Sequence, residues 1–139
     1  MTTYDNIWET FLTICGYDSS ELPKEDSKIY LLIKSGLRLY NQLADKYENR
    51  IQGNLEMNDT SETLNIELKD TEILIFVNLM ASVFAYNKYT EFTSIWSVFT
   101  KETSITSYKS QCQAREYTIQ CFKDEATRLI EDEIDSFEV

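Results

Sequence analysis

The sequence of 139 residues contains no histidine. Histidine is the commonest general base near neutral pH and the commonest metal ligand, so its absence removes much of acid–base and metal chemistry. The three glycines lie too far apart to form a phosphate-binding loop, and no nucleophile-elbow, kinase or Cys-x-x-Cys motif is present. We therefore expect a protein that is not an enzyme, with no catalytic residues, no cofactor and no metal site.

Residues that break regular structure are also scarce. One proline and three glycines favour long regular elements and argue against a many-stranded barrel or sandwich with its many tight turns. The length suits one domain, and the apolar content of 42% is far from a disordered composition. We expect residues 1–139 to form a single, mainly helical domain.

Basic residues are few: 13 against 24 acidic residues, for a net charge of −11. Such a charge repels phosphate backbones and anionic membranes, so tight DNA binding is not expected. The longest uncharged apolar stretch, Ile73–Asn87, is shorter than the ~18–20 residues of a membrane span. Asp5 and Glu9 stand where a signal peptide would be basic. We expect no membrane association and synthesis in the cytoplasm.

The cysteine count is odd, and no pair of cysteines has metal-ligand spacing. If Cys112 and Cys121 share a helix, they lie on opposite faces, separated by about 13 Å along the axis. That distance excludes a disulfide. Together with Cys15 they are therefore predicted to be free, structural thiols.

Apolar residues at steps of three and four predict four helices, at about residues 3–15, 23–49, 70–99 and 108–136. Thr3 suits the start of the first helix and Gly16 its end. Gly36 falls on the apolar side of the second helix, where it permits close helix contact. The third helix is apolar almost all round over Ile73–Met80 and is predicted to be the buried central helix. Asp70 is a candidate cap for this helix, with Glu72 at its positive end.

Between the second and third helices the pattern changes to alternation. Apolar residues at Ile51, Leu55 and Met57, and again at 64, 66 and 68, flank the turn-forming stretch 58–62. This pattern predicts a β-hairpin over about residues 51–68. Because two strands are marginal alone, the hairpin must lie on the helices or be ordered by a neighbouring subunit. We expect a mainly α, four-helix bundle-like domain with a long central helix and one inserted β-hairpin.

Two groups of side chains are candidates for contact surfaces. The aromatic end of the third helix is either core or a subunit interface, and the same applies to the hairpin. The interface candidates are Tyr86, Tyr89, Phe92, Trp96, Phe99, Leu55 and Met57. The end of the last helix carries an acidic face at Glu131, Asp132 and Asp135. Adjacent helical positions point apart, so a solvated face is favoured there over a cation site.

The order Leu68-Lys69-Asp70-Thr71-Glu72-Ile73-Leu74-Ile75, then Asn78-Leu79-Met80, then an aromatic-rich helix end, resembles the head–tail connector proteins of tailed bacteriophages. The resemblance implies a structural virion protein of the neck, made in the host cytoplasm. It would form a homo-oligomeric ring, commonly of twelve copies, between the portal protein and the tail or the next neck ring protein. Such a ring extends the DNA channel, and an acidic wall would let DNA pass without tight binding.

An alternative from another class remains open. A monomeric acidic inhibitor, similar to an immunity protein, would place its carboxylates in one patch that matches the basic cleft of a nuclease. The oligomeric state separates the two hypotheses, because a connector associates with itself and an inhibitor stays monomeric. An enzyme that works with carboxylates alone is disfavoured by the missing motifs.

Overall fold

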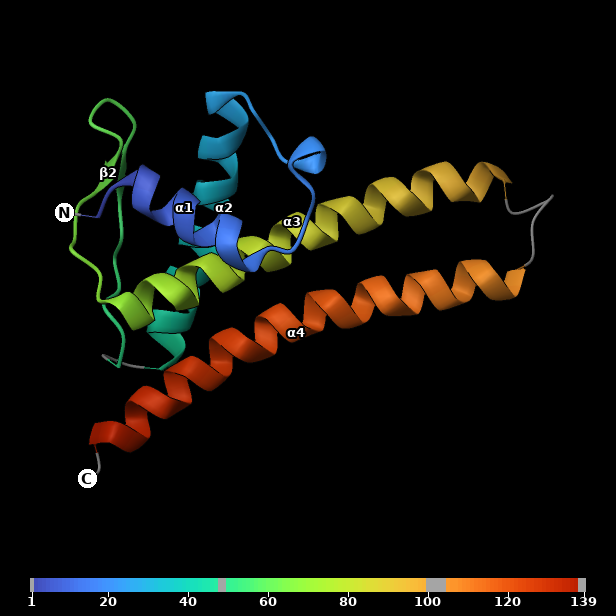
Figure 1. Cartoon of the computed structure of the whole chain (residues 1–139). Helices are drawn as coiled ribbons and strands as arrows, with labels where there is room; N and C mark the ends of the chain where they lie inside the picture. The colour runs from blue at the N-terminus through green and yellow to red at the C-terminus, as the bar shows by residue number, and fades with distance from the viewer. Residues whose placement is uncertain (1, 48–49, 100–104, 138–139) are drawn as a thin grey trace.

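The computed structural model describes residues 2–47, 50–99 and 105–137, with side chains at 2–47, 50–95 and 108–131. Its helices are α1 (Tyr4–Ile14), α2 (Asp26–Lys46), α3 (Asp70–Phe99) and α4 (Ile105–Phe137). A short 3-10 turn, η1 (Ser19–Glu21), precedes α2, and two short strands, β1 (Met57–Asn58) and β2 (Thr63–Leu64), form an antiparallel hairpin. The predicted mainly helical fold with one hairpin is confirmed (Figure 1).

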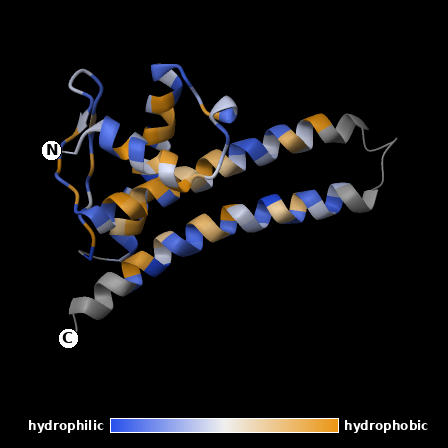
Figure 2. Ribbon diagram, in the orientation of Figure 1, coloured by the Kyte–Doolittle hydropathy of each residue, from blue (hydrophilic) through white to orange (hydrophobic). Residues whose placement is uncertain are grey.

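The first half of α3 is the centre of the fold. Ile75, Phe76, Val77 and Met80 are completely buried, as expected for a helix without a polar face. Helices α1, α2 and α4 all pack on α3. Figure 2 shows the hydrophobic colour concentrated on this half of α3, whereas its second half is mixed. The prediction that Ile73–Met80 forms the core is confirmed.

The start of α3 is capped by Glu72 and not by Asp70. The Glu72 carboxylate is 7% exposed and accepts backbone hydrogen bonds from Lys69 at 3.0 Å and from Gln52 at 2.7 Å. The Tyr40 hydroxyl donates to the same carboxylate at 3.4 Å. A glutamate at the third helical position that binds the capping residue's N–H is half of a capping box. Glu72 therefore joins α2, the loop before the hairpin and α3.

The close approach of α2 to α3 depends on Gly36. A Cβ atom at this position would overlap the Met80 side chain and lie 3.2 Å from Phe76. Glycine here costs helix propensity but lets the two backbones approach. The expectation of close helix contact at Gly36 is confirmed.

Several predicted helix boundaries need correction. Thr3 caps α1, because its hydroxyl accepts from the Asn6 N–H at 3.1 Å, and Gly16 adopts a positive φ of 72° just after the helix. However, α2 begins at Asp26, because η1 occupies the chain just before Pro23. Helix α4 begins at Ile105, three residues before its predicted start at residue 108.

The hairpin is part of the domain and lies on its helices. Leu55 and Leu64 are buried at 2% and 0% exposure. The N-terminus adds to the hairpin, since the Leu64 N–H donates to the Thr2 carbonyl at 2.8 Å. The regular strands are shorter than expected, because the Asn41 side chain of α2 takes over the pairing: it binds both the N–H and the carbonyl of Leu55, at 2.9 and 3.1 Å. Leu55 thus belongs to the domain's own core and presents no surface to a neighbour.

The three cysteines are free. Cys15 is buried, Cys112 is partly buried and Cys121 is exposed. Cys112 and Cys121 lie on different faces of α4, as their spacing predicts.

We predict that Gly36→Ala destabilises the protein by about 1–3 kcal/mol, because the added methyl group overpacks the contact with Met80. Helix propensity alone predicts the opposite sign, a gain of about 1 kcal/mol. The measurement is chemical denaturation. Lys34→Ala, two residues earlier on the exposed side of α2, should change the free energy of unfolding by less than about 0.5 kcal/mol. A stabilised Gly36→Ala variant would show that α2 and α3 do not approach closely there.

We predict that Glu72→Ala costs about 2–4 kcal/mol, because it leaves the Lys69 and Gln52 N–H groups without their acceptor. Asp70→Ala is the matched control: it removes an exposed acid from the same helix end and should cost less than about 1 kcal/mol. The free energy of unfolding is measured by thermal and urea denaturation. Equal losses in the Glu72→Ala and Asp70→Ala variants would show that Glu72 acts only through its charge.

Candidate functional site

The second half of α3 and the first half of α4 form an antiparallel pair that projects from the body of the protein (Figure 1). We call residues 86–99 and 105–118 the arm. The body consists of α1, α2 and the hairpin packed around the first half of α3. The loop with η1 reaches the start of the arm, where Leu22 and Pro23 line a pocket with Asn87 and Glu91, and the rest of the arm projects beyond it. The arm is therefore the part of the fold with the least cover from its own chain.

Aromatic and polar contacts hold the arm together. Phe92 is buried and stacks on Tyr108 of α4, with ring centroids 6.0 Å apart. The Arg115 guanidinium lies over the Phe92 ring, 4.3 Å from its centroid. On the same side of the pair, the Tyr89 hydroxyl donates to the Glu116 carboxylate at 2.7 Å. This hydrogen bond, with a smaller effect of burial, raises the pKa of Tyr89 from its ordinary 10.0 to about 12.

Helix α4 contacts α3 along one stripe that follows a heptad-like spacing. The residues on this stripe are buried or partly buried and recur at alternating steps of four and three: 108, 112, 115, 119, 122 and 126. Such spacing is typical of two helices that pack side by side over many turns. The stripe is polar at its arm end, with Cys112 and Arg115, and apolar toward the body, with Ile119 and Ala126. The helix pair thus buries less apolar surface within the arm than toward the body.

The outer surface of the arm exposes large apolar side chains. Tyr86 and Ile95 of α3 are 56% and 59% exposed, and Tyr117 of α4 is 72% exposed. Of the predicted interface residues, Tyr86 is thus exposed, Tyr89 is partly buried and Phe92 is buried. The side chains of the two others on this helix, at positions 96 and 99, lie outside the described residues. The arm is a mixture of inner contacts and exposed apolar groups.

The hairpin residues do not join this surface. Leu55 is in the core, and Met57 is partly buried at β1, on the body. The predicted interface set is therefore divided between the arm and the body. Ile95 and Tyr117 were missed because an isolated apolar residue in an amphipathic helix is expected to face inward.

A groove lies between α2 and α4, which both pack on α3. We call it the α2–α4 groove; it has a volume of about 330 Å³. Its lining consists of leucines and small polar residues with two lysines: Leu39, Gln42, Leu43, Lys46, Leu79, Ser82, Lys123 and Thr127. Lys46 and Lys123 are the charged members of this lining. Sequence reasoning missed the groove, because three separate helices must meet to form it.

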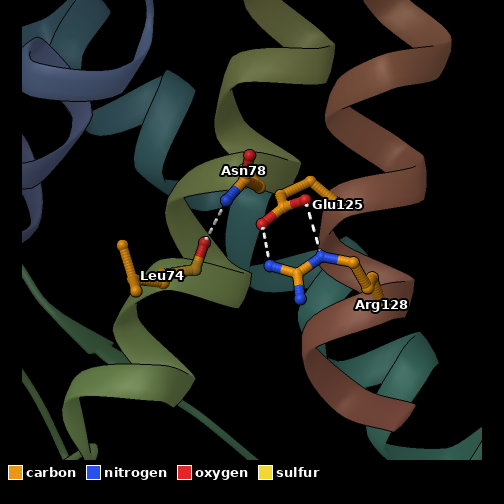
Figure 3. Close-up of polar contacts among 4 residues, drawn as sticks. All are labelled: Leu74, Asn78, Glu125 and Arg128. Atoms are coloured by element: carbon orange, nitrogen blue, oxygen red, sulfur yellow. Dashed lines mark hydrogen bonds and ion pairs between the residues drawn. The ribbon is translucent and has the colours of Figure 1, made fainter. Parts of the chain in front are cut away.

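The acidic part of α4 begins beyond this groove. Glu131 is exposed, whereas the side chains of Asp132 and Asp135 lie outside the described residues. About one turn before Glu131, Arg128 forms a two-pronged ion pair with Glu125, at 3.0 and 2.5 Å, beside Asn78 and Leu74 of the facing α3 (Figure 3). The hydrogen bonds from Arg128 lower the pKa of Glu125. Among the described residues, no group of three or more His, Cys, Asp or Glu residues is placed to hold a metal ion.

A family model for the YomZ prophage protein matches residues 1–135. A relative in Bacillus subtilis (strain 168), a SPbeta prophage-derived uncharacterized protein YomZ, is 33% identical over 130 residues, which is 94% of each chain. The chain belongs to the YomZ prophage protein family. It is therefore a protein of phage origin. No solved structure matches it.

This family assignment corrects the resemblance to head–tail connectors, which was wrong. The matches cover nearly the whole chain and identify the YomZ family and no connector family. The physical reason for the error is visible at the start of α3. An acidic residue before an apolar run is what any buried helix with a glutamate cap requires, and Glu72 has this structural role.

Within the described residues, none of the helices has the length and hydropathy that crossing a membrane requires.

We predict that Glu116→Ala returns the pKa of Tyr89 from about 12 toward 10.0, because the phenol loses its acceptor. The neutral phenol is favoured in the folded state. The stability that Tyr89 contributes is therefore complete below pH 10 and is lost as the pH rises through 12. Nuclear magnetic resonance of tyrosine labelled at Cζ resolves this titration. Glu91→Ala, on the arm but away from Tyr89, is the control and should leave the pKa of Tyr89 unchanged. A pKa of Tyr89 near 10 in the wild-type protein would contradict the hydrogen bond to Glu116.

Proposed function

We propose that this member of the YomZ family is a non-catalytic assembly protein of the phage, whose copies associate with each other and present a joint surface to other phage proteins. The observation that carries the proposal is the arm. It projects from the body and exposes Tyr86, Ile95 and Tyr117. Exposed aromatic and large aliphatic groups on a protruding element are typical of protein interfaces.

The arm also has the construction of a contact element. Its two helices are joined by a few specific contacts, such as the Phe92–Arg115 stacking and the Tyr89–Glu116 hydrogen bond. These contacts fix the shape of the arm but bury only one face of each helix. A partner that packs on the outer faces would bury Ile95 and Tyr117 at little cost in ordering the backbone. The ring, portal and tail that the connector resemblance implied are not part of the proposal.

The buried polar groups support a non-catalytic role. Glu72 is the acidic side chain buried in the described core, and backbone N–H groups and the Tyr40 hydroxyl occupy its oxygens. A carboxylate so occupied caps a helix and is not available to accept a substrate proton. The lining of the α2–α4 groove offers leucines, lysines and small polar groups, which suit binding more than acid–base chemistry.

One observation favours the acidic inhibitor as a second candidate. Carboxylates gather where the hairpin turn meets the start of α2: Asp59 accepts from the Tyr4 hydroxyl at 2.7 Å, and Glu62 and Asp26 lie near Tyr30. Burial and the Asp59 hydrogen bond raise the pKa of Tyr4 well above its ordinary value. A basic partner could bind this acidic corner, and the protein would then act as a monomer.

Mass measurement in solution separates these candidates. We predict that the wild-type protein self-associates as its concentration rises. The double variant Ile95→Ser with Tyr117→Ser should weaken this association at least about tenfold, because it removes apolar contact area. The measurement is size-exclusion chromatography with light scattering. Gln111→Ser with Gln113→Ser, at exposed positions of α4, is the control and should have no effect.

A wild-type protein that stays monomeric up to its solubility limit would contradict the assembly proposal. If that monomer also binds a basic nuclease, and Asp59→Asn with Glu62→Gln abolishes the binding, the inhibitor takes its place.

A further inference from the structure

We propose that the α2–α4 groove is the site where one copy of the protein receives the acidic C-terminal end of α4 from a second copy. This inference rests on the proposed self-association and adds a second contact between copies to the one that the arm makes. It does not involve the exposed residues of the arm.

The shape suits a helix. Helices α2 and α4 both pack on α3, and between them Leu79 and Ser82 of α3, exposed by only 5% and 1%, form the floor of the groove. Leu39 and Leu43 of α2, one turn apart, form one wall and are only partly buried. Leucines one turn apart, above an apolar floor and opposite a second helix, are the usual construction of a groove that receives the apolar face of an amphipathic helix.

The charge selects an acidic helix. The protein carries a net charge of −11, so most of its surface repels a second copy. The groove is an exception, because its charged lining residues are Lys46 and Lys123, one on each wall. A helix with apolar residues on one face and carboxylates beside them would bury the leucines and pair both lysines. Such complementarity favours one orientation of the incoming helix.

The chain itself contains such a segment. Residues 131–139 read Glu-Asp-Glu-Ile-Asp-Ser-Phe-Glu-Val, with Ile134 and Phe137 three positions apart among five acids. The backbone is helical to Phe137. The segment cannot enter the groove of its own chain, because the same continuous helix already forms one wall through Lys123 and Thr127. A second copy must supply it, and the contact is then heterologous, joining unlike surfaces head to tail.

A charge-swap experiment tests this contact. Lys46→Glu with Lys123→Glu changes the groove, and Glu131→Lys with Asp135→Lys changes the end of α4. Each double variant alone should self-associate at least about tenfold more weakly than the wild type. An equimolar mixture of the two should form a heterodimer, because reversed groove and reversed helix end attract each other again. Lys24→Glu with Lys34→Glu is the control, since it changes the net charge equally at exposed positions outside the groove.

The outcomes separate this inference from the proposed function. Circular dichroism first establishes that each variant is folded, and recovery in the mixture is a gain that misfolding cannot produce. If the wild type self-associates but both double variants associate equally well, the groove is not the site and the assembly proposal stands. If the wild type self-associates but the mixture of the two double variants forms no heterodimer, the pairing of the groove with the end of α4 is also overturned. A wild type that is monomeric at all concentrations overturns both.

Discussion

The structure depends on one constraint: a helix with apolar residues all round must be covered on every side. The first half of α3 is such a helix, with Ile75, Phe76 and Met80 completely buried. Three helices pack on it, and α2 approaches closely only because Gly36 leaves room for the Met80 side chain. The backbone N–H groups at the start of α3 also need acceptors away from water. The buried Glu72 carboxylate accepts from the Lys69 N–H there and from the Gln52 N–H of the loop before the hairpin. Between α2 and α4 the packing leaves the α2–α4 groove, whose floor residues Leu79 and Ser82 are nevertheless buried.

The same helix changes character along its length. Toward its C-terminal end α3 is accompanied by α4 alone, and its second half carries a mixture of aromatic, polar and charged groups. Phe92 finds its cover from Tyr108 and Arg115, but Ile95 and Tyr86 remain exposed. Among the described residues, apolar surface is therefore left on the arm, at single positions of the body such as Leu12 and Leu31, and around the lysine-bordered groove. The arm and the groove lie apart, which allows each copy to make two separate contacts with other proteins.

Sequence patterns predicted what depends on local periodicity. The central position of Ile73–Met80, the cap at Thr3, the contact at Gly36 and the free cysteines were all derived from spacing and residue type, and the structure agrees. What the sequence could not supply depends on pairs of residues far apart. The side chain of Asn41 replaces strand pairing at Leu55, and no rule of alternation contains that contact. Likewise, the sequence around a glutamate at the third position of a helix does not reveal whether its side chain is solvated or buried against another helix.

The candidate surfaces were predicted less well, for the same reason. Aromatic density identified the second half of α3, but the exposure of a single side chain depends on how α4 lies against it. Phe92 is consequently buried, whereas Tyr86 is exposed. The connector resemblance failed because its motif consisted of features that any capped, buried helix shares. The match over residues 1–135 to the YomZ family draws on the whole chain, which a local pattern of apolar residues does not.

Methyl resonance spectra recorded as the protein concentration is raised show directly whether a second copy binds at the α2–α4 groove. We predict that the methyl signals of Leu39, Leu43 and Leu79 shift progressively with concentration, because a second copy enters the groove. The methyl signals of Leu64 and Ile33, which are buried elsewhere in the core, should stay in place. Groove signals that do not move while the protein is shown to self-associate would contradict the account.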